Sequence, residues 1–246
     1  MPADLEMTES IRLAKHVAEH FSCSRREAEQ YIEGGWVLVD GAVVEEPGHR
    51  VANAEVTLHP DATLAPQAAV TILLNKPAGV EALADVALLL PYLTAAARAG
   101  DDRSGLRMLR RHLQQLTLAT PLGKVCAGLI VLTQDFRVTR KLVDDAARIE
   151  YEFIVEVRGQ IVSDGLARLN AGIALPGRPP GPVKVSWQNE TRLRFAAKAL
   201  KTGHVTVMCK AVGLQAVGMR RIRIGRLPMA GLAEGCWRYL AAHERF

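Results

Sequence analysis

Paired basic residues at the start of a helical segment are the first feature of the sequence that could bind a charged ligand. Arg25 and Arg26 follow Ser24, and Glu27 stands three residues after Ser24, which is the spacing of a capping box. In the first turn of a helix, an arginine and the free backbone N–H groups can bind one phosphate together. The alternative is that both arginines are surface residues paired with nearby glutamates.

A second basic pair lies in an apolar segment close to the C-terminus. Arg221 and Arg223 are two residues apart in a strand predicted from Arg220 to Ile224, so alternation places them on one face of that strand. Such a stripe could follow a phosphate backbone. A solvent-facing sheet surface without a ligand is the alternative.

The histidines and cysteines do not predict a metal site. His16 and His20 are one helical turn apart, a spacing that metal sites use, but no acidic or cysteine companions accompany them, so we interpret them as surface residues. The four cysteines are far apart and form no C-x-x-C motif, which argues against a disulfide framework or a zinc site. They are Cys23, Cys126, Cys209 and Cys236.

The composition is that of a soluble globular protein. Hydrophobic residues make up 49% and charged residues 23% of the 246 residues, which excludes a disordered chain, a collagen and a coiled coil. No apolar run approaches the roughly 18 residues that a membrane span needs. The start of the chain lacks the basic and apolar segments of a secretion signal. We therefore expect a cytoplasmic protein with no membrane contact.

The first 60 residues are predicted to form a small domain of two helices followed by a sheet. Apolar residues recur at helical spacing from Ser10 to Phe21, and a second helix is predicted from Arg25 to Glu33. Asp40-Gly41 is a strong signal for a two-residue hairpin. Five basic and eleven acidic residues give this part a net charge of −6.

The rest of the chain is predicted to be a mixed, mostly antiparallel α+β domain over residues 71–246, after a linker at 61–70. Helices are expected at 81–99 and 138–147, and a proline- and glycine-rich loop at 176–182. Residues 61–246 carry 26 basic and 15 acidic residues, a net charge of +11. A basic body of this kind favours a polyanionic partner, with RNA or DNA the commonest.

The first part of the chain resembles the S-four-type (alpha-L) RNA-binding domain in residue types, spacing and predicted elements over about 50 residues. The matching segments are Arg12 to Lys15, Ser24 to Ala28, Ile32 to Val37 and Val39 to Gly41. In that family the helix pair presents basic residues to RNA phosphates. The resemblance therefore implies RNA contacts from Arg12, Lys15, Ser24, Arg25 and Arg26.

Most of residues 71–240 resemble the catalytic domain of the ribosomal RNA pseudouridine synthases of the RsuA/RluF type. The motifs that carry the resemblance are L-L-N-K-P-A-G from Leu73, P-L-G from Pro121, G-L-I-V-L-T-Q-D from Gly128, R-R-I-R-I-G from Arg220 and G-C-W-R from Gly235. Such enzymes detach uracil from its ribose, rotate it and reattach it through carbon. The resemblance implies ribosomal RNA as the partner, an ionised aspartate, a base-stacking ring and no cofactor, and it places Lys76 near the cleft.

The central motif of that family, G-R-L-D-x-D-x-x-G-L, is three residues shorter in this sequence. Only four residues separate Gly123 from Gly128. Aligned from the left, Lys124 takes the place of the arginine and Cys126 that of the nucleophilic aspartate, so the carboxylate is absent. A thiol is mostly neutral unless a neighbour such as Lys124 lowers its pKa. The alternative for Cys126 is a small buried core residue.

A rival position for the nucleophile lies upstream. Asp101 and Asp102 begin the run D-D-R-S-G-L, which is loosely similar to the family's D-x-D-T-S-G-L but lacks the apolar strand that should follow. A polar loop is the alternative. Asp135 matches a family position that is not the nucleophile.

Two further positions differ from the family pattern. Phe153 takes the place of the base-stacking tyrosine and has no hydroxyl, while Tyr151 replaces a lysine. An ordinary core aromatic is the alternative for Phe153. The family's basic segment corresponds to Gly203–Cys209, which holds no arginine or lysine, and His204 is interpreted as a solvated loop histidine.

Two hypotheses follow. The protein is either an RNA pseudouridine synthase that uses an unconventional residue or a non-catalytic RNA-binding protein, such as a ribosome-assembly factor, on a decayed synthase scaffold. Sequence similarity favours the first, and the missing carboxylate favours the second. Both predict RNA as the partner, and we expect a monomer.

Overall fold

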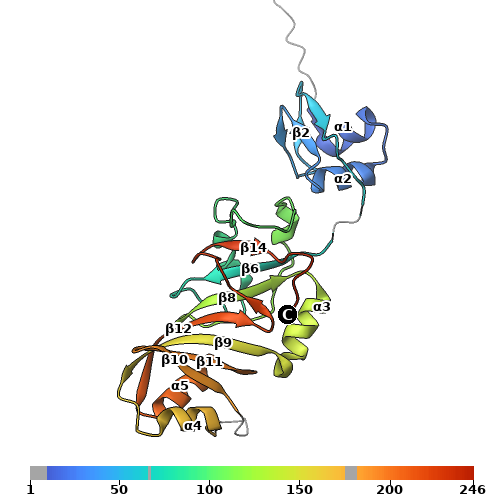
Figure 1. Ribbon diagram of the computed structural model, residues 1–246. Coiled ribbons are helices and arrows are strands. Elements are labelled where there is room, and N and C mark those ends of the chain that lie inside the picture. The colour runs from blue at the N-terminus through green and yellow to red at the C-terminus, as the bar shows by residue number, and fades with distance from the viewer. Residues whose placement is uncertain (1–9, 66–67, 175–181) are drawn as a thin grey trace, which may run out of the picture. The chain divides into compact units, whose positions relative to one another are not determined.

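The computed structural model describes residues 10–65, 68–174 and 182–246 (Figure 1). The chain's first residues, positions 66–67 of the predicted linker and positions 176–181 of the predicted loop lie outside the described residues. Contacts divide the chain into two compact units. The first ends at Ala68 and also takes in Arg107–Gln114, while the second comprises Ala69–Leu106 and Gln115–Phe246.

Two helices of the first unit pack against short strands. Helix α2 (Arg25–Glu33) has its predicted bounds, and the capping box is confirmed, because Ser24 Oγ accepts from the Glu27 N–H and the Glu27 carboxylate accepts from the Ser24 N–H. Helix α1 (Leu13–His20) begins three residues later than predicted. The reason is strand β1 (Ile11–Arg12), which pairs with β4 (Arg50–Val51) and keeps the backbone extended.

A three-stranded sheet completes the first unit, in the order β3-β2-β5. Its strands are β2 (Val37–Val39), β3 (Ala42–Val43) and β5 (Val56–Leu58). The predicted hairpin is confirmed: Asp40 and Gly41 have φ values of 50° and 80°, the left-handed conformation that a tight two-residue turn requires. Leu13, Val17 and Ile32 are fully buried between the helices and this sheet.

A segment from later in the sequence also belongs to the first unit. Residues Arg107–Gln114 include the 3₁₀ helix η3 (Arg110–Leu113). Arg107 donates from Nη1 to the carbonyl of Gly35 at 2.6 Å, and its guanidinium lies 4.8 Å from the centroid of the Trp36 ring. Sequence proximity gave no indication of this contact, so the predicted domain over residues 1–60 lacks the segment.

The second unit is built on a mixed sheet in the order β10-β11-β9-β12-β8-β6-β14 (Figure 1). Neighbours are antiparallel except for β12 and β8, which are parallel, so the predicted fold class is confirmed. The strands of this path are β6 (Thr71–Lys76), β8 (Cys126–Thr133), β9 (Glu150–Gly159), β10 (Lys184–Asn189), β11 (Arg192–Lys198), β12 (Leu214–Ile224) and β14 (Trp237–Tyr239). Two short strands pair at the side, β7 (Thr117–Leu118) with β8 and β13 (Leu227–Pro228) with β12.

The helical segments of the second unit are short. They are α3 (Phe136–Thr139), a π-helical turn η4 (Arg140–Asp144), a 3₁₀ turn η5 (Ala146–Arg148), α4 (Gly165–Ala171) and α5 (Thr202–Ala211). The helix predicted at 81–99 is wrong: this stretch holds only the 3₁₀ turns η1 (Val86–Leu88) and η2 (Leu90–Tyr92). Pro91 has no N–H to donate, so a helix cannot continue through it. No helix within the described ranges has the length and apolar character to cross a bilayer.

A register shift in β12 separates two residues that alternation predicts on one face. Arg221 lies opposite Phe153 on β9, whereas Arg223 lies opposite Glu152, because the pairing is irregular between positions 221 and 223. Since neighbouring residues of a strand point to opposite faces, Arg221 and Arg223 lie on opposite faces of the sheet. The predicted stripe is therefore wrong.

Candidate nucleic-acid interface and interior cleft

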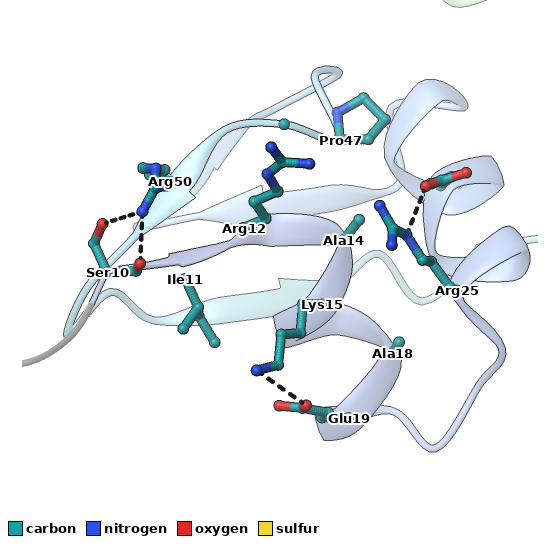
Figure 2. A pocket seen from close by; sticks show the side chains of 12 residues that line it. Ser10, Ile11, Arg12, Ala14, Lys15, Ala18, Glu19, Arg25, Pro47 and Arg50 are labelled. Carbon is teal, nitrogen blue, oxygen red and sulfur yellow. Dashed lines mark hydrogen bonds and ion pairs between the residues drawn. The ribbon is translucent and has the colours of Figure 1, made fainter.

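A groove of about 530 Å³ lies on the first unit, where β1, α1, α2 and β4 meet (Figure 2). Four basic side chains contribute to it, one each from β1, α1, α2 and β4. The lining residues are Ser10, Ile11, Arg12, Ala14, Lys15, Ala18, Glu19, Arg25, Glu29, Pro47, Gly48 and Arg50. Although the first 60 residues carry more acidic than basic residues, four basic and two acidic side chains line this groove.

Two of these cations are held in exposed ion pairs, drawn as dashed lines in Figure 2. Lys15 Nζ lies 3.9 Å from a Glu19 oxygen, and Arg25 Nε lies 3.2 Å from a Glu29 oxygen. The side chains of Lys15 and Arg25 are 64% and 71% exposed, so these pairs contribute little and can exchange for phosphate at small cost. No ion pair of Arg12 occurs within the described residues.

The groove brings together three of the predicted RNA-binding residues, Arg12, Lys15 and Arg25. Ser24 caps α2, and Arg26 is exposed but does not line the groove. Sequence reasoning missed Arg50, whose Nη1 donates to the carbonyl of Ser10 at 2.9 Å. Arg50 reaches this face through the pairing of β1 with β4, and no local sequence pattern predicts that pairing.

The second unit contains a cleft of about 490 Å³ with mostly apolar walls. It lies against the face of the sheet that carries Tyr151 and Phe153 of β9 and Arg221 of β12. The lining residues are Leu83, Leu118, Ala119, Thr120, Pro121, Leu122, Gly123, Leu142, Val143, Ala146, Tyr151, Phe153, Ala199, Leu200, Lys201, Thr202 and Arg221. No aspartate, glutamate, histidine or cysteine is among these described residues.

Arg221 is the most deeply buried charge of the cleft, with 4% of its surface exposed. Its guanidinium donates to three backbone carbonyls: Nε to Leu129 at 2.7 Å, Nη2 to Thr120 at 2.6 Å and Nη1 to Pro121 at 3.3 Å. Burial lowers the pKa of Arg221 to about 10, so the side chain remains charged at neutral pH. The Tyr151 ring lies 5.5 Å from the guanidinium carbon, and burial raises the pKa of its phenol.

The two residues aligned with the family's catalytic motif do not line the cleft. Cys126 is fully buried at the start of β8, where Sγ donates to the carbonyl of Ala127 at 3.4 Å. Burial raises the pKa of the Cys126 thiol despite the opposing charges of Arg221 and Lys76, so it stays protonated at neutral pH. Lys124 is exposed, and its carbonyl accepts from the Gly79 N–H at 2.8 Å.

The candidate aspartates also lie away from the cleft lining. The Asp102 carboxylate accepts from Arg98 Nε at 2.8 Å, from the Ser104 N–H at 2.9 Å and from the Tyr239 N–H at 3.2 Å. Burial acts to raise the pKa of Asp102, but these hydrogen bonds outweigh it and lower the pKa. Asp135 caps α3 by accepting from the Arg137 N–H. Asp101 is exposed.

Phe153 is the one predicted catalytic-site residue that lines the cleft, and it is fully buried in the cleft wall.

Lys76, a predicted RNA-binding residue, is also buried. Its Nζ donates to the carbonyls of Pro77 at 2.9 Å and Val80 at 2.7 Å, and burial lowers the pKa of the side chain. Lys76 and Arg221 therefore do not form an exposed phosphate-binding surface. Arg223 pairs with Glu150 and the buried Glu152, both at 2.5 Å.

The structure also tests two predictions about histidines. His204 lies in the first turn of α5, not in a loop, and its Nδ1 accepts from the Lys201 N–H at 3.4 Å. The rings of His16 and His20 stack with centroids 5.6 Å apart. Across the part of the chain that the structure describes, no group of three metal-ligating side chains occurs.

Comparisons with known proteins agree with this two-part architecture. Residues 11–55 match the S4 domain family. The chain is 26% identical to the dual-specificity RNA pseudouridine synthase RluF of Escherichia coli K12, over 96% of this chain and 77% of that protein. It is also 26% identical to the ribosomal large subunit pseudouridine synthase B of Bacillus subtilis, over 95% of this chain and 93% of that protein.

A crystal structure of a pseudouridylate synthase has the same fold. It covers 94% of this chain and 96% of its own, with a TM-score of 0.58 and 20% identity. The chain thus has the fold of a pseudouridine synthase, with a segment similar to the S4 domain at residues 11–55. The two relatives named above match nearly the whole of this chain and are by name pseudouridine synthases, one of them RluF, which confirms the resemblance predicted from the sequence motifs.

Proposed function

We propose that the protein binds ribosomal RNA through the groove of its S4 domain and that its synthase-like cleft does not isomerise uridine. The observation that carries the second half is the lining of the cleft. In the described residues it presents Arg221 and Lys201 but no carboxylate. The reaction of the related enzymes calls for an ionised aspartate at this place.

RNA binding is supported by the charge and geometry of the groove. Arg12, Lys15, Arg25 and Arg50 come from four elements and surround one hollow (Figure 2). Arg25 stands in the first turn of α2, where the capping box of Ser24 and Glu27 already uses part of the helix end, so the arginine side chain supplies the positive charge. Contacts of this kind bind phosphates without reading sequence. The names of the relatives, which include a ribosomal large subunit enzyme, favour ribosomal RNA.

Loss of isomerase chemistry is supported by the state of the residue in the aspartate's place. A positioned carboxylate is charged at neutral pH, whereas burial keeps Cys126 a neutral thiol. Neither Cys126 nor Asp102 lines the cleft, so neither reaches a nucleotide bound there without a rearrangement of the fold. A non-catalytic RNA-binding protein, such as a ribosome-assembly factor, fits this arrangement.

An active isomerase is the second candidate, because the similarity to synthases extends over nearly the whole chain. Mapping of pseudouridine in ribosomal RNA from cells with and without the protein separates the two. We expect identical maps. A pseudouridine that disappears on deletion and returns with the wild-type protein would establish an active enzyme, and Cys126→Ala and Asp102→Asn variants would then test which residue acts.

RNA binding itself is tested with purified full-length protein and fragments of ribosomal RNA in a filter-binding or fluorescence titration. We expect affinity that falls steeply as salt rises, since each phosphate contact releases bound counterions. No measurable affinity at low ionic strength would contradict the proposal.

A further inference from the structure

The sheet of the second unit has a buried face and an exposed face. In β9, Tyr151 and Phe153 line the cleft, so Glu152 between them points to the opposite side of the sheet. Strand β11 alternates in the same way, with Leu193 buried and Arg194 exposed. Strands β10, β11, β9 and β12 lie side by side in this order (Figure 1). We call the side of these four strands that carries Glu152 the open face.

Basic side chains outnumber acidic ones on the open face. The strand register and the alternation of side chains place basic residues on all four strands: Lys184, Arg192, Arg194, Lys198, Arg158, Arg220 and Arg223. The acidic residues of these strands are all on β9 and point to the same side: Glu150, Glu152 and Glu156. Arg220 also pairs with Glu234 of a following loop. The open face therefore carries a net positive charge.

Glu152 anchors two of these arginines. Its carboxylate is 1% exposed, and one oxygen accepts a hydrogen bond from Arg194 Nε while the other accepts from Arg223 Nε. Neither Nη nitrogen of Arg194 is bonded within the described residues, and the Arg194 side chain is 51% exposed. An arginine that is held at Nε keeps its outer donors free, and such a pair of donors can bind one phosphate through two hydrogen bonds. The fold thus orients Arg194 for an anion from outside the chain.

Exposed cations without an acidic partner surround this anchored arginine. In the part of the chain that the structure describes, no ion pair is formed by Lys184, Arg192, Lys198 or Arg158. Arg192, Arg194 and Lys198 point to the same side of β11. Lys184 of β10 lies opposite Ala196 and so fills the gap between Arg194 and Lys198. At about 3.4 Å per residue, this row of cations is about 20 Å long, which suits an extended polyanion.

We propose that the open face is a second RNA-binding surface, which contacts the phosphate backbone and lies on the other side of the sheet from the cleft. Interfaces with nucleic acids are polar and strongly positive, whereas interfaces with proteins have an apolar centre. Among the residues of β10, β11 and β9 that point to this face, Ile154 alone is large and apolar, and it is partly buried. The charge and the lack of an apolar centre favour RNA over an acidic protein. This inference rests on the proposed function, because the partner is the RNA that the S4 groove binds.

Acetylation of lysines in the full-length protein, with and without a fragment of ribosomal RNA, tests where the RNA lies. Peptide mass spectrometry measures the rate at each site. We expect RNA to slow the acetylation of Lys184 and Lys198 at least about threefold, because their ammonium groups contact phosphates. Lys210, which is exposed on α5, is the control and should react at an unchanged rate. Lys15 reports on the groove independently, so protection of Lys15 without protection of Lys184 and Lys198 would overturn the inference and leave the groove proposal intact.

A triple variant tests whether the open face contributes to affinity. Lys184→Gln, Arg192→Gln and Lys198→Gln together remove three exposed cations, and none of these residues is bonded to Glu152. The buried carboxylate therefore keeps both of its arginines, and thermal unfolding confirms that the variant is folded. We expect RNA affinity to fall at least about tenfold at moderate salt and the slope of log affinity against log salt to decrease by about 2, since each phosphate contact contributes about 0.7 to 0.9.

A matched control removes the same charge from exposed positions outside these four strands. Arg140→Gln, Arg168→Gln and Lys210→Gln together should leave the salt slope unchanged, because distant charges are screened at moderate salt. An unchanged slope in the open-face variant, or an equal change in the control, would overturn the inference and leave an acidic protein as the candidate partner. A loss in the open-face variant with none in Arg12→Gln would contradict the groove proposal instead. No affinity of the wild-type protein for RNA would overturn both.

Discussion

The groove of the S4 domain and the cleft of the second unit both present arginine, but in opposite settings. Arg25 is 71% exposed and shares its charge with an exposed glutamate, whereas Arg221 is 4% exposed and bonded to carbonyls. Water screens the first charge, so its partner can be exchanged at little cost. The Arg221 guanidinium is held rigidly by the fold, and it depends on the backbone carbonyls around it to offset the cost of burying its charge. The difference separates surface charges that can contact a long flexible polyanion from an interior charge that holds backbone segments of the second unit together.

The largest effect is expected for the buried arginine. Arg221→Met leaves the carbonyls of Leu129, Thr120 and Pro121 without their donor, and we expect a loss of about 3 kcal/mol in the free energy of unfolding. Urea denaturation measures it. The matched groove variant Arg12→Met should change stability by less than about 0.5 kcal/mol. Equal losses in the free energy of unfolding for the two variants would contradict the difference between groove and cleft.

Cysteine reactivity sharpens the same contrast. Cys126 and Cys209 are buried, and burial raises the pKa of both thiols, that of Cys209 to about 11. Cys23 of the S4 domain is partly exposed; burial and the Glu27 carboxylate raise the pKa of its thiol as well, so the contrast rests on exposure. We expect iodoacetamide at pH 8 to modify Cys126 at least about 100-fold more slowly than Cys23 in the native protein, measured by peptide mass spectrometry. All four cysteines should react in urea. Rapid alkylation of Cys126 in the native protein would support the hypothesis that Cys126 acts as a nucleophile.

Asp102 is an intermediate case, with a carboxylate that is itself only 3% exposed but is paired with a partly exposed arginine, Arg98. Asp102→Asn removes a charged acceptor with three donors, and we expect a loss of about 2 kcal/mol at pH 7. Because the pKa of Asp102 is lowered in the folded state, its contribution is complete above the unfolded pKa of about 4 and is lost as pH falls further. The difference between variant and wild type should therefore shrink at pH 3. A difference that persists at pH 3 would show that shape, not charge, matters there.

The smallest effect is expected for single charges of the groove. Arg12→Gln and Arg50→Gln should each weaken binding of ribosomal RNA about tenfold at moderate salt and reduce the slope of log affinity against log salt by about 0.7 to 0.9. Arg168→Gln, in α4 of the second unit, is the exposed control and should have no such effect. Unchanged salt slopes in both groove variants would contradict RNA binding at this face.

The sequence predicted the parts of the fold that depend on local patterns. The capping box at Ser24 and the turn at Asp40 are set by residues within a few positions of one another. The motifs also identified the strand and the ring that border the cleft. Phe153 was found because its place in an otherwise matching run is distinctive.

Features that depend on distant pairings could not be predicted. The irregular register between Arg221 and Arg223 has no local signal, and a shift by one residue reverses the face of every side chain beyond it. Arg50 joins the groove only through the β1–β4 pairing. The attachment of Arg107 to Gly35 joins positions that are 72 residues apart.

Gly128, the first residue of the motif G-L-I-V-L-T-Q-D, shows that a motif residue can be required for packing alone. It has φ = +111°, and a Cβ there would collide with the backbone of Arg221, where β8 and β12 run parallel. Any larger residue would wedge these two strands apart and displace the anchored guanidinium. The packing of the two strands alone is therefore enough to require a glycine here, so its presence in a sequence is evidence for the sheet and carries no information about catalysis.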